Sequence, residues 1–356
     1  MSLSIGIVGL PNVGKSTLFQ TLTKKQVSAE NYPFCTIEPN IGTVAVPDER
    51  LNVLAQLSKS VKVLPTTIEF IDIAGLVKGA SKGEGLGNTF LSNIRQVDAI
   101  CHVIRSFYND DITHVENRIN PIEDADIINT ELLLADLDQV TKALSQVEKK
   151  VKSKDPLSLE IFPILQKIEP AIQSGIAIRD IGLDRKELDL IKSYSFLTAK
   201  PMMYVVNTDE TYEMSSELRD SLGHNIVPLS IKIESEISLM DVEEQKEYLE
   251  MLGRDMSGLD ILIQEGYSLL NLISFLTTGP QETKAWTVLN GTLAPQAGGV
   301  IHSDIERGFI MADIISYQDF VDCGSEAVAR QQGKLRQEGK SYVIQDGDVC
   351  HFKFNV

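Results

Sequence analysis

The chain opens with a repeated pattern of short apolar runs separated by stretches of helical spacing. Most of the runs are continuously apolar, as expected of strands that are buried on both faces of a covered sheet. The candidate strands are residues 5–8, 41–46, 67–71, 99–104, 202–206 and 226–229. Strands that alternate with helices predict an α/β domain with a doubly wound sheet.

The interval between residues 104 and 202 interrupts this pattern, because it contains no clear strand. Its apolar positions follow the alternating steps of four and three that mark a heptad seam: Leu133, Leu137, Val140, Leu144, Val147 and Val151. Asp155 and Pro156 suit the N-cap and first position of a second helix, whose apolar stripe is Leu157, Ile161, Ile164, Ile168 and Ile172.

We expect an antiparallel helical hairpin, inserted at about residues 126–195 and projecting from the α/β domain. Two ordinary helices packed on the sheet are the alternative. Pro163 and Pro170 should kink or shorten the second helix, because proline removes a backbone donor and clashes with the preceding turn.

The pattern changes again near residue 278. Residues 277–280, Thr-Thr-Gly-Pro, indicate a linker, and short β-type runs follow at 285–289, 309–315, 342–344 and 349–354. One helical stretch spans about 316–330, and residues 345–348, Gln-Asp-Gly-Asp, have the composition of a hairpin turn. We therefore expect a small α+β module at 278–356, separate from a domain at 1–277.

Candidate chemistry is concentrated at the ends of the predicted strands. Residues 9–16, Gly-Leu-Pro-Asn-Val-Gly-Lys-Ser, form a complete Walker A phosphate loop between an apolar strand and a helix. Gly9 and Gly14 let backbone N–H groups face inward, where they and the helix N-terminus bind an anion. Lys15 adds charge on the outer phosphates, and the Ser16 hydroxyl can bind Mg²⁺. The motif predicts a nucleoside triphosphate site.

A second motif, Asp72-Ile-Ala-Gly75, ends an apolar strand downstream of the phosphate loop. In P-loop switches such an Asp supports Mg²⁺ through water, and the Gly amide senses the γ-phosphate. The loop between the two motifs offers Thr36 as a second Mg²⁺ ligand, which would let the metal order that loop. The next residue is Leu76, where many switches carry the glutamine that orients the attacking water. Hydrolysis is therefore slow or depends on another group.

The base-reading motif departs from that of guanine-binding proteins, which carry Asn-Lys-x-Asp after an apolar strand. Here the strand at 202–206 is followed by Asn207-Thr208-Asp209-Glu210. This sequence lacks the Lys and places Asp209 one position out of register. Asn207 can still address a purine, so adenine becomes as good a candidate as guanine, or a better one.

Composition narrows the class of protein. The 356 residues suffice for two or three domains, and a net charge of −17 argues against general attraction to nucleic acid or anionic lipid. No run of 18 apolar residues predicts a membrane span, and the first residues lack the basic start of a signal peptide. Neither a zinc site nor a disulfide framework is indicated, because no Cys-x-x-Cys pair is formed by Cys35, Cys101, Cys323 and Cys350. The cytosol is the expected compartment.

Two basic clusters stand out against the acidic average. The first lies at the expected hairpin tip and comprises Lys149, Lys150, Lys152 and Lys154. The second lies in the C-terminal module and comprises Arg330, Lys334, Arg336 and Lys340. Either cluster taken alone is most simply a solvated helix end.

Several long motifs together resemble the Obg-like ATPases of the YchF type. They are residues 9–17, 31–40, 72–88, 279–286, 299–304, 308–310 and 346–356, so the resemblance covers essentially the whole chain. It implies a G domain, an inserted coiled-coil hairpin and a C-terminal TGS module of β-grasp fold. It also implies ATP preferred over GTP, dependence on Mg²⁺ and association with the ribosome.

The resemblance suggests roles for individual residues as well. It places the adenine contact on Thr208, offers His114 as the substitute catalytic group beside Lys15, and links Asn12 to a potassium ion at the phosphates. On the residues alone, His114 is a surface loop histidine. The nucleotide site that we expect comprises Asn12, Val13, Gly14, Lys15, Ser16, Thr17, Gly75, Asn207, Thr208 and Ser230. Around Mg²⁺ we expect Ser16, Thr36 and, through water, Asp72.

We therefore expect a cytosolic, monomeric P-loop ATPase that acts as a nucleotide-regulated switch on the ribosome, and two basic clusters on its accessory elements favour contact with RNA. A GTP-specific switch with a loosened base site is one alternative, which a comparison of ATP and GTP affinities tests. The other is a ribosome-binding module that uses nucleotide only as a structural ligand. Leu76 keeps it open, and single-turnover hydrolysis tests it.

Overall fold

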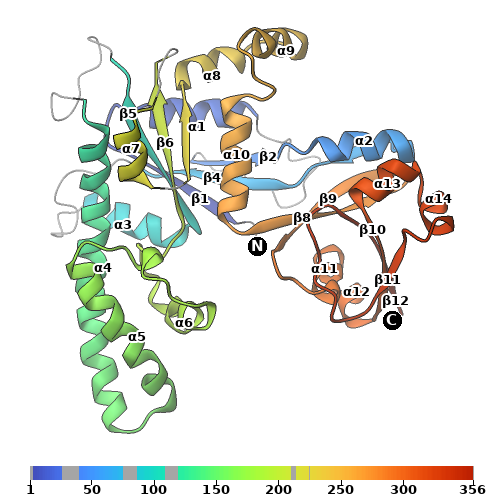
Figure 1. Cartoon of the computed structure of the whole chain (residues 1–356). Coiled ribbons are helices and arrows are strands. Elements are labelled where there is room, and N and C mark those ends of the chain that lie inside the picture. Colours follow the sequence, from blue (N-terminus) through green and yellow to red (C-terminus); the bar gives the residue numbers. More distant parts are fainter. Residues whose placement is uncertain are drawn as a thin grey trace.

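A computed structural model describes residues 3–25, 40–74, 86–108, 119–209, 214–223 and 225–355. Two six-stranded sheets organise this part of the chain (Figure 1). The first has the strand order β2-β4-β1-β5-β6-β7, and its neighbouring strands are parallel except for β2 against β4. Its strands are β1 (Ser4–Val8), β2 (Ile41–Ala45), β4 (Thr67–Asp72), β5 (Ala99–Ser106), β6 (Met202–Thr208) and β7 (Ile226–Leu229).

Helices cover both faces of the first sheet, which confirms the doubly wound α/β domain (Figure 1). Every residue of the central strands β5 and β6 is buried, as their continuous apolar runs predicted. The helices around this sheet are α1 (Lys15–Lys24), α3 (Leu86–Gln96), α7 (Ser216–Leu222), α8 (Ile231–Ile237), α9 (Val242–Met251) and α10 (Gly258–Leu269).

The predicted helical hairpin is present, formed by α4 (Pro121–Lys152) and α5 (Pro156–Gln173) (Figure 1). Asp155 caps α5 as expected, accepting a hydrogen bond from Ser158 N at 2.9 Å. The first part of α4 packs on the sheet, and its last part packs against α5. The arrangement therefore combines the projecting hairpin with the packed helix that was its alternative. α5 continues through both internal prolines and is much shorter than α4.

A buried carboxylate joins the hairpin to the α/β domain. Asp136, in the middle of α4, accepts hydrogen bonds from the backbone N–H groups of Leu197 and Thr198 at 2.9 and 2.7 Å. The Thr198 hydroxyl donates a third, at 2.7 Å. Burial raises the pKa of Asp136, although these donors oppose the shift. The chain returns to β6 through Ile178–Asp180, α6 (Arg185–Ile191) and Lys192–Tyr194.

The second sheet has the order β11-β10-β12-β8-β9-β3. Its central strands β8 and β12 are parallel, as in a β-grasp fold, and helices pack on both faces of the sheet. The strands are β3 (Lys62–Leu64), β8 (Leu272–Thr278), β9 (Glu282–Leu289), β10 (Phe309–Ser316), β11 (Arg336–Glu338) and β12 (Asp348–Phe354). The helices are α2 (Glu49–Ser58), α11 (Ala294–Ile301), α12 (Ser303–Arg307), α13 (Tyr317–Cys323) and α14 (Glu326–Gln331).

The expectation of a linker at residues 277–280 is wrong. Thr277 and Thr278 end β8, and Gly279 N–H donates to Glu282 O at 3.0 Å in the β8–β9 hairpin. A Gly-Pro turn after threonines has the composition of a linker, but here it reverses a strand. Because β8 already pairs within the second sheet, we propose that the domain boundary lies near residue 270, between α10 and β8.

Two further expectations for the C-terminal module are wrong in detail. The helix expected at 316–330 is broken into α13 and α14, and Gly324 adopts a left-handed φ of 70° between them. Residues 345–348 do not join two paired strands of the described chain, since Val343 forms only an isolated bridge to Leu293. The strands β3, β8 and β11 had no clear sequence signal. None of the described helices combines the length and apolarity needed to span a membrane.

Candidate functional site

The phosphate loop connects β1 to α1 and adopts the backbone geometry that an anion site requires. Gly14 precedes α1 with a φ of 101°, and Asn12 has a φ of 64°. A Cβ on Gly14 would lie 2.6 Å from the Asn207 side chain, and one on Gly9 would lie 2.7 Å from Val103 O. Both positions therefore need glycine, and the loop is held closely between two strand ends. Its N–H groups and the start of α1 can bind phosphate.

Lys15 lies beside Asp72 at the mouth of this loop. Its ammonium donates to Ile73 O at 2.7 Å and lies 3.6 Å from Asp72 Oδ1. Burial lowers the pKa of Lys15, and the Asp72 carboxylate opposes that shift. The structure thus brings together two residues that the sequence placed in one site, 57 positions apart in the chain.

The residues present fit a hard divalent cation. Asp72 Oδ1 is buried and accepts no hydrogen bond from the described residues. The Ser16 and Thr17 side chains are exposed at the start of α1. Carboxylate and hydroxyl oxygens are donors of the kind that Mg²⁺ prefers. Thr36, Gly75, Leu76, His114 and Glu210 lie outside the described residues, and their roles stay predictions.

Asn207 is buried, and both polar atoms of its side chain contact backbone. Its Nδ2 donates to Val13 O at 3.0 Å, and its Oδ1 accepts from Ile231 N at 3.1 Å. The carboxamide therefore ties the phosphate loop to the start of α8. This geometry supports a role in positioning the base-binding segments, whereas direct contact with a purine stays a prediction.

A cavity of about 910 Å³ opens beside the phosphate loop. Its lining includes the expected residues Asn12, Gly14, Thr17, Asn207, Thr208 and Ser230. Residues that the sequence analysis missed also line it, among them Phe107, Tyr108, Lys232, Glu236 and Leu239. Phe107 and Tyr108 directly follow the end of β5. Ligands of open α/β sheets bind at the carboxyl ends of the strands, and that rule would have found these two residues.

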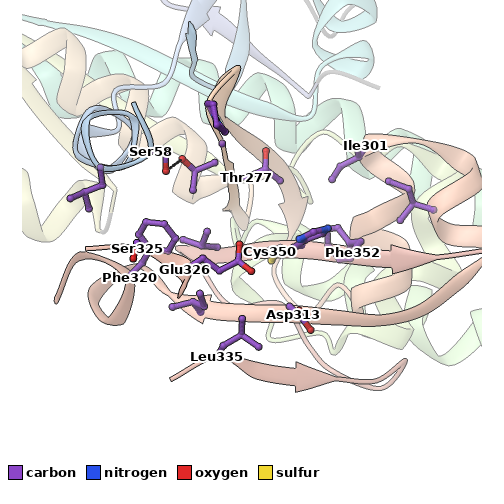
Figure 2. A pocket seen from close by; sticks show the side chains of 18 residues that line it. Ser58, Thr277, Ile301, Asp313, Phe320, Ser325, Glu326, Leu335, Cys350 and Phe352 are labelled. Atoms are coloured by element: carbon purple, nitrogen blue, oxygen red, sulfur yellow. Dashed lines mark hydrogen bonds between the residues drawn. The ribbon is translucent and has the colours of Figure 1, made fainter. Parts of the chain in front are cut away.

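A second cavity, of about 540 Å³, lies in the C-terminal module between the sheet, α2 and α14 (Figure 2). Its lining combines apolar side chains, among them Ile301, Phe320, Leu335 and Phe352, with polar and acidic ones. Its acidic groups Asp313 and Glu326 both accept from Arg330. These two acids are thus engaged within the protein, and the Walker A chemistry lies at the other cavity.

The chain matches known proteins along its whole length. One family model, described as "50S ribosome-binding GTPase", matches residues 4–154. Another, YchF-GTPase_C, described as "Protein of unknown function (DUF933)", matches residues 272–355. The Ribosome-binding ATPase YchF of Haemophilus influenzae is 52% identical, and that of Bacillus subtilis is 50% identical. Each alignment covers 100% of both chains.

A solved structure agrees with these matches. The structure of the Schizosaccharomyces pombe YchF GTPase superimposes with a TM-score of 0.88 at 39% identity. The superposition covers 99% of this chain and 98% of that one. The likeness thus includes the hairpin and the C-terminal module as well as the α/β domain, and the chain belongs to the YchF family of P-loop proteins.

Proposed function

We propose that this chain is a Mg²⁺-dependent ATPase that binds the ribosome in a nucleotide-regulated way. The observation that carries the proposal is the phosphate loop, with Lys15 beside Asp72, next to a cavity of about 910 Å³. Ligand cavities usually measure about 300–1,000 Å³. Full-length relatives that are 52% and 50% identical are named Ribosome-binding ATPase, which supports both the reaction and the partner.

In this proposal the loop amides and Lys15 bind the phosphates. Ser16, Thr36 and, through water, Asp72 hold Mg²⁺, which when bound neutralises charge on the phosphate oxygens. Lys15 would then leave Ile73 O for the phosphates. His114 as the group that assists the attacking water, Gly75 as the γ-phosphate sensor and a K⁺ ion near Asn12 belong to the same proposal.

The preference for ATP rests on the residues at the carboxyl end of β6. Thr208 stands where guanine-binding proteins have the Lys that packs on the base. The Asp209 carboxylate accepts from Tyr108 N–H at 3.3 Å, so it is directed to backbone at the cavity rim. Thr208 carries no carboxylate, and Asp209 lies one position out of register with the residue that accepts from guanine N1–H and N2–H. Adenine needs no such carboxylate.

Ribosome contact is proposed through the hairpin tip and the C-terminal module, with the protein as a monomer. The tip lysines are exposed at the far end of the hairpin from the sheet (Figure 1). RNA phosphates attract such local positive charge even on a chain whose net charge is −17.

Nucleotide binding, hydrolysis and sedimentation with ribosomes test the proposal together. We expect wild type to bind ATP at least tenfold more tightly than GTP, about 1.4 kcal/mol. Lys15→Ala should lose hydrolysis and most nucleotide affinity while its circular dichroism spectrum stays unchanged. A wild type that prefers GTP tenfold contradicts the base assignment, and full turnover by Lys15→Ala contradicts the site. A chain that binds ATP but never sediments with ribosomes contradicts the partner.

A further inference from the structure

The start of α10 anchors a buried carboxylate from a neighbouring helix. Glu234, on α8, accepts hydrogen bonds from Gly258 N at 2.8 Å and Leu259 N at 3.1 Å. Glu234 is only 1% exposed. The first amides of a helix have no partners within the helix and carry partial positive charge. Glu234 therefore fixes α8 against α10 through a charged contact in the interior.

The helix that Glu234 fixes begins at the nucleotide cavity. Ser230 and Ile231, at the start of α8, line that cavity, as do Lys232 and Ser235 further along it. Glu234 N–H donates to Ser230 O at 3.0 Å, so Glu234 lies one turn from the cavity wall. Ile231 N–H in turn holds Asn207, which holds the phosphate loop at Val13. The contacts run without interruption from α10 to the phosphate loop.

The contact at α10 is closely fitted. A Cβ on Gly258 would lie 2.6 Å from Glu234 Oε1 and 3.1 Å from the Leu229 Cβ. Capping alone does not require Glu234, because Ser257 already caps α10 by accepting from Asp260 N at 3.1 Å. Burying a carboxylate is costly and raises the pKa of Glu234. The contact between Glu234 and the start of α10 therefore fixes the position of α8.

The phosphate side of the site is tied to the same anchor. Lys25, just after α1, donates to Asp260 Oδ1 at 2.7 Å and to Ser257 Oγ at 3.1 Å. The helix that follows the phosphate loop and the helix that lines the base cavity are therefore both attached to the start of α10. Lys25 is half-buried there, whereas Glu234 is fully enclosed.

We propose that Glu234 is a positioning residue for the nucleoside half of the bound nucleotide, acting through α8 and Ser230–Ile231. The inference rests on the proposed nucleotide-binding function. Without the carboxylate, α8 loses its anchor and the wall around the base and ribose loosens. The phosphate loop keeps Gly9, Gly14 and Lys15, and the helix that follows it keeps its separate attachment to α10 through Lys25. Loss of Glu234 should therefore weaken the binding of ligands that carry a nucleoside. The binding of ligands that consist only of phosphate should be nearly unchanged.

The test compares two ligands on matched variants of the full chain in the presence of Mg²⁺. The ligands are ATP and inorganic tripolyphosphate, and the variants are Glu234→Ala, Glu234→Gln and the control Glu247→Gln, an exposed acid on α9. We expect Glu234→Ala to lower the affinity for ATP about tenfold, a change of about 1.4 kcal/mol. The affinity for tripolyphosphate should fall less than about twofold. The KM for ATP should rise while kcat at saturation stays near wild type. Glu234→Gln, which keeps one acceptor oxygen, should recover part of the loss.

The outcomes separate this inference from the proposed function. If wild type binds neither ligand, the proposed function fails and the inference falls with it. If wild type binds ATP and the Glu234 variants bind it equally well, only the inference is overturned. Equal weakening of ATP and tripolyphosphate, or a fall in kcat alone, also overturns it. Should Glu234→Ala not fold, Glu234→Gln gives the same comparison with the smaller expected loss.

Discussion

Two basic clusters with the same number of charges differ in what those charges contact. The tip cluster is Lys149, Lys150, Lys152 and Lys154, and the C-terminal cluster is Arg330, Lys334, Arg336 and Lys340. In the C-terminal cluster, Arg330 contacts Asp313 at 3.2 Å, Lys334 contacts Asp319 at 2.9 Å, and Arg336 lies 3.6 Å from Asp348. In the tip cluster, Lys152 pairs with Glu148 on the same helix at 3.0 Å.

The difference shows that charge density along a sequence does not measure the charge available to a partner. Three members of the C-terminal cluster are directed to the protein's own carboxylates, two of which, Asp313 and Asp348, are buried. Lys149, Lys150 and Lys154 are exposed, and no ion pair joins them to the described residues. We therefore expect the C-terminal cluster to act mainly on stability and the tip cluster mainly on binding of a polyanion.

The largest effect should follow from removing the acid at the centre of the C-terminal cluster. Asp313 is 3% exposed and accepts from Lys353, Arg330 and Gln337. Breaking a fully buried pair costs about 3–5 kcal/mol. Because Lys353 and Arg330 are partly exposed, we expect Asp313→Ala to cost somewhat less, about 2–3 kcal/mol.

Urea unfolding followed by the fluorescence of Trp286 measures this loss, since Trp286 is the chain's one tryptophan and lies in β9 of the same sheet. Asp319→Ala is the matched control, because Asp319 pairs with the same cluster at a more exposed site. Equal destabilisation by the two variants contradicts the distinction between buried and exposed acids.

The second effect concerns the tip cluster. Changing Lys149, Lys150, Lys152 and Lys154 together to Gln should weaken sedimentation with ribosomes at low salt by about ten- to a hundredfold. The dependence of log affinity on log salt should flatten by up to roughly one unit for each phosphate that the variant no longer binds. ATP hydrolysis without ribosomes should be unchanged, because the tip is remote from the phosphate loop (Figure 1). The matching quadruple variant of the C-terminal cluster tests the distinction. The distinction is contradicted if that variant loses more ribosome binding than the tip variant while its free energy of unfolding stays unchanged.

The sequence identified features whose physical cause is local. The phosphate loop needs glycines at fixed spacing before a helix, and the heptad seam of α4 and the Asp155 cap follow from short-range pattern. These were predicted because their determinants lie within a few residues of one another. The helix α5 continues through its two prolines and is shorter than α4, whereas a kink at either proline stays a prediction.

The features that were missed depend on residues distant in the chain. Asn207 was expected in the site, but its contact with Val13, 194 positions away, was not. β3 pairs in parallel with β9 although more than 200 residues separate them. No periodicity marks Glu234 as the residue that binds the start of α10. The sequence does not indicate which acids pair with the C-terminal cluster either. Asp313 contacts Arg330 only because the fold places β10 beside α14.

Acid should weaken the C-terminal sheet through the same cluster. Burial would raise the pKa of Asp313, but hydrogen bonds from Lys353 and Gln337 outweigh it, so the pKa lies below the ordinary 3.8. The unfolded chain therefore binds the proton more readily. The contribution of Asp313 to stability is present above about pH 4 and is lost as pH falls through the lowered pKa.

Trp286 fluorescence during urea unfolding, recorded between pH 6 and pH 3, follows this loss for wild type and Asp313→Asn. The stability difference between the two should shrink as the pH falls, because protonated Asp313 resembles the amide. Arg330 and Lys353, which face Asp313, keep their charge across this range. A difference that stays constant with pH contradicts the role assigned to the ionised carboxylate.

The smallest and sharpest comparison exchanges one lysine in each cluster. Lys150→Gln removes an exposed charge that forms no ion pair with the described residues, so the ribosome salt slope should fall by about 0.9 if it contacts one phosphate. Lys334→Gln removes a charge already paired with Asp319, and releasing that carboxylate offsets any loss of attraction. Its slope should change by less than about 0.3. Both substitutions keep a side chain of similar length and change the net charge equally, so bulk electrostatics cannot separate them. If the two single variants show the same slope, then the ion pairs within the C-terminal cluster open on binding, and the clusters contribute to the ribosome contact in the same way.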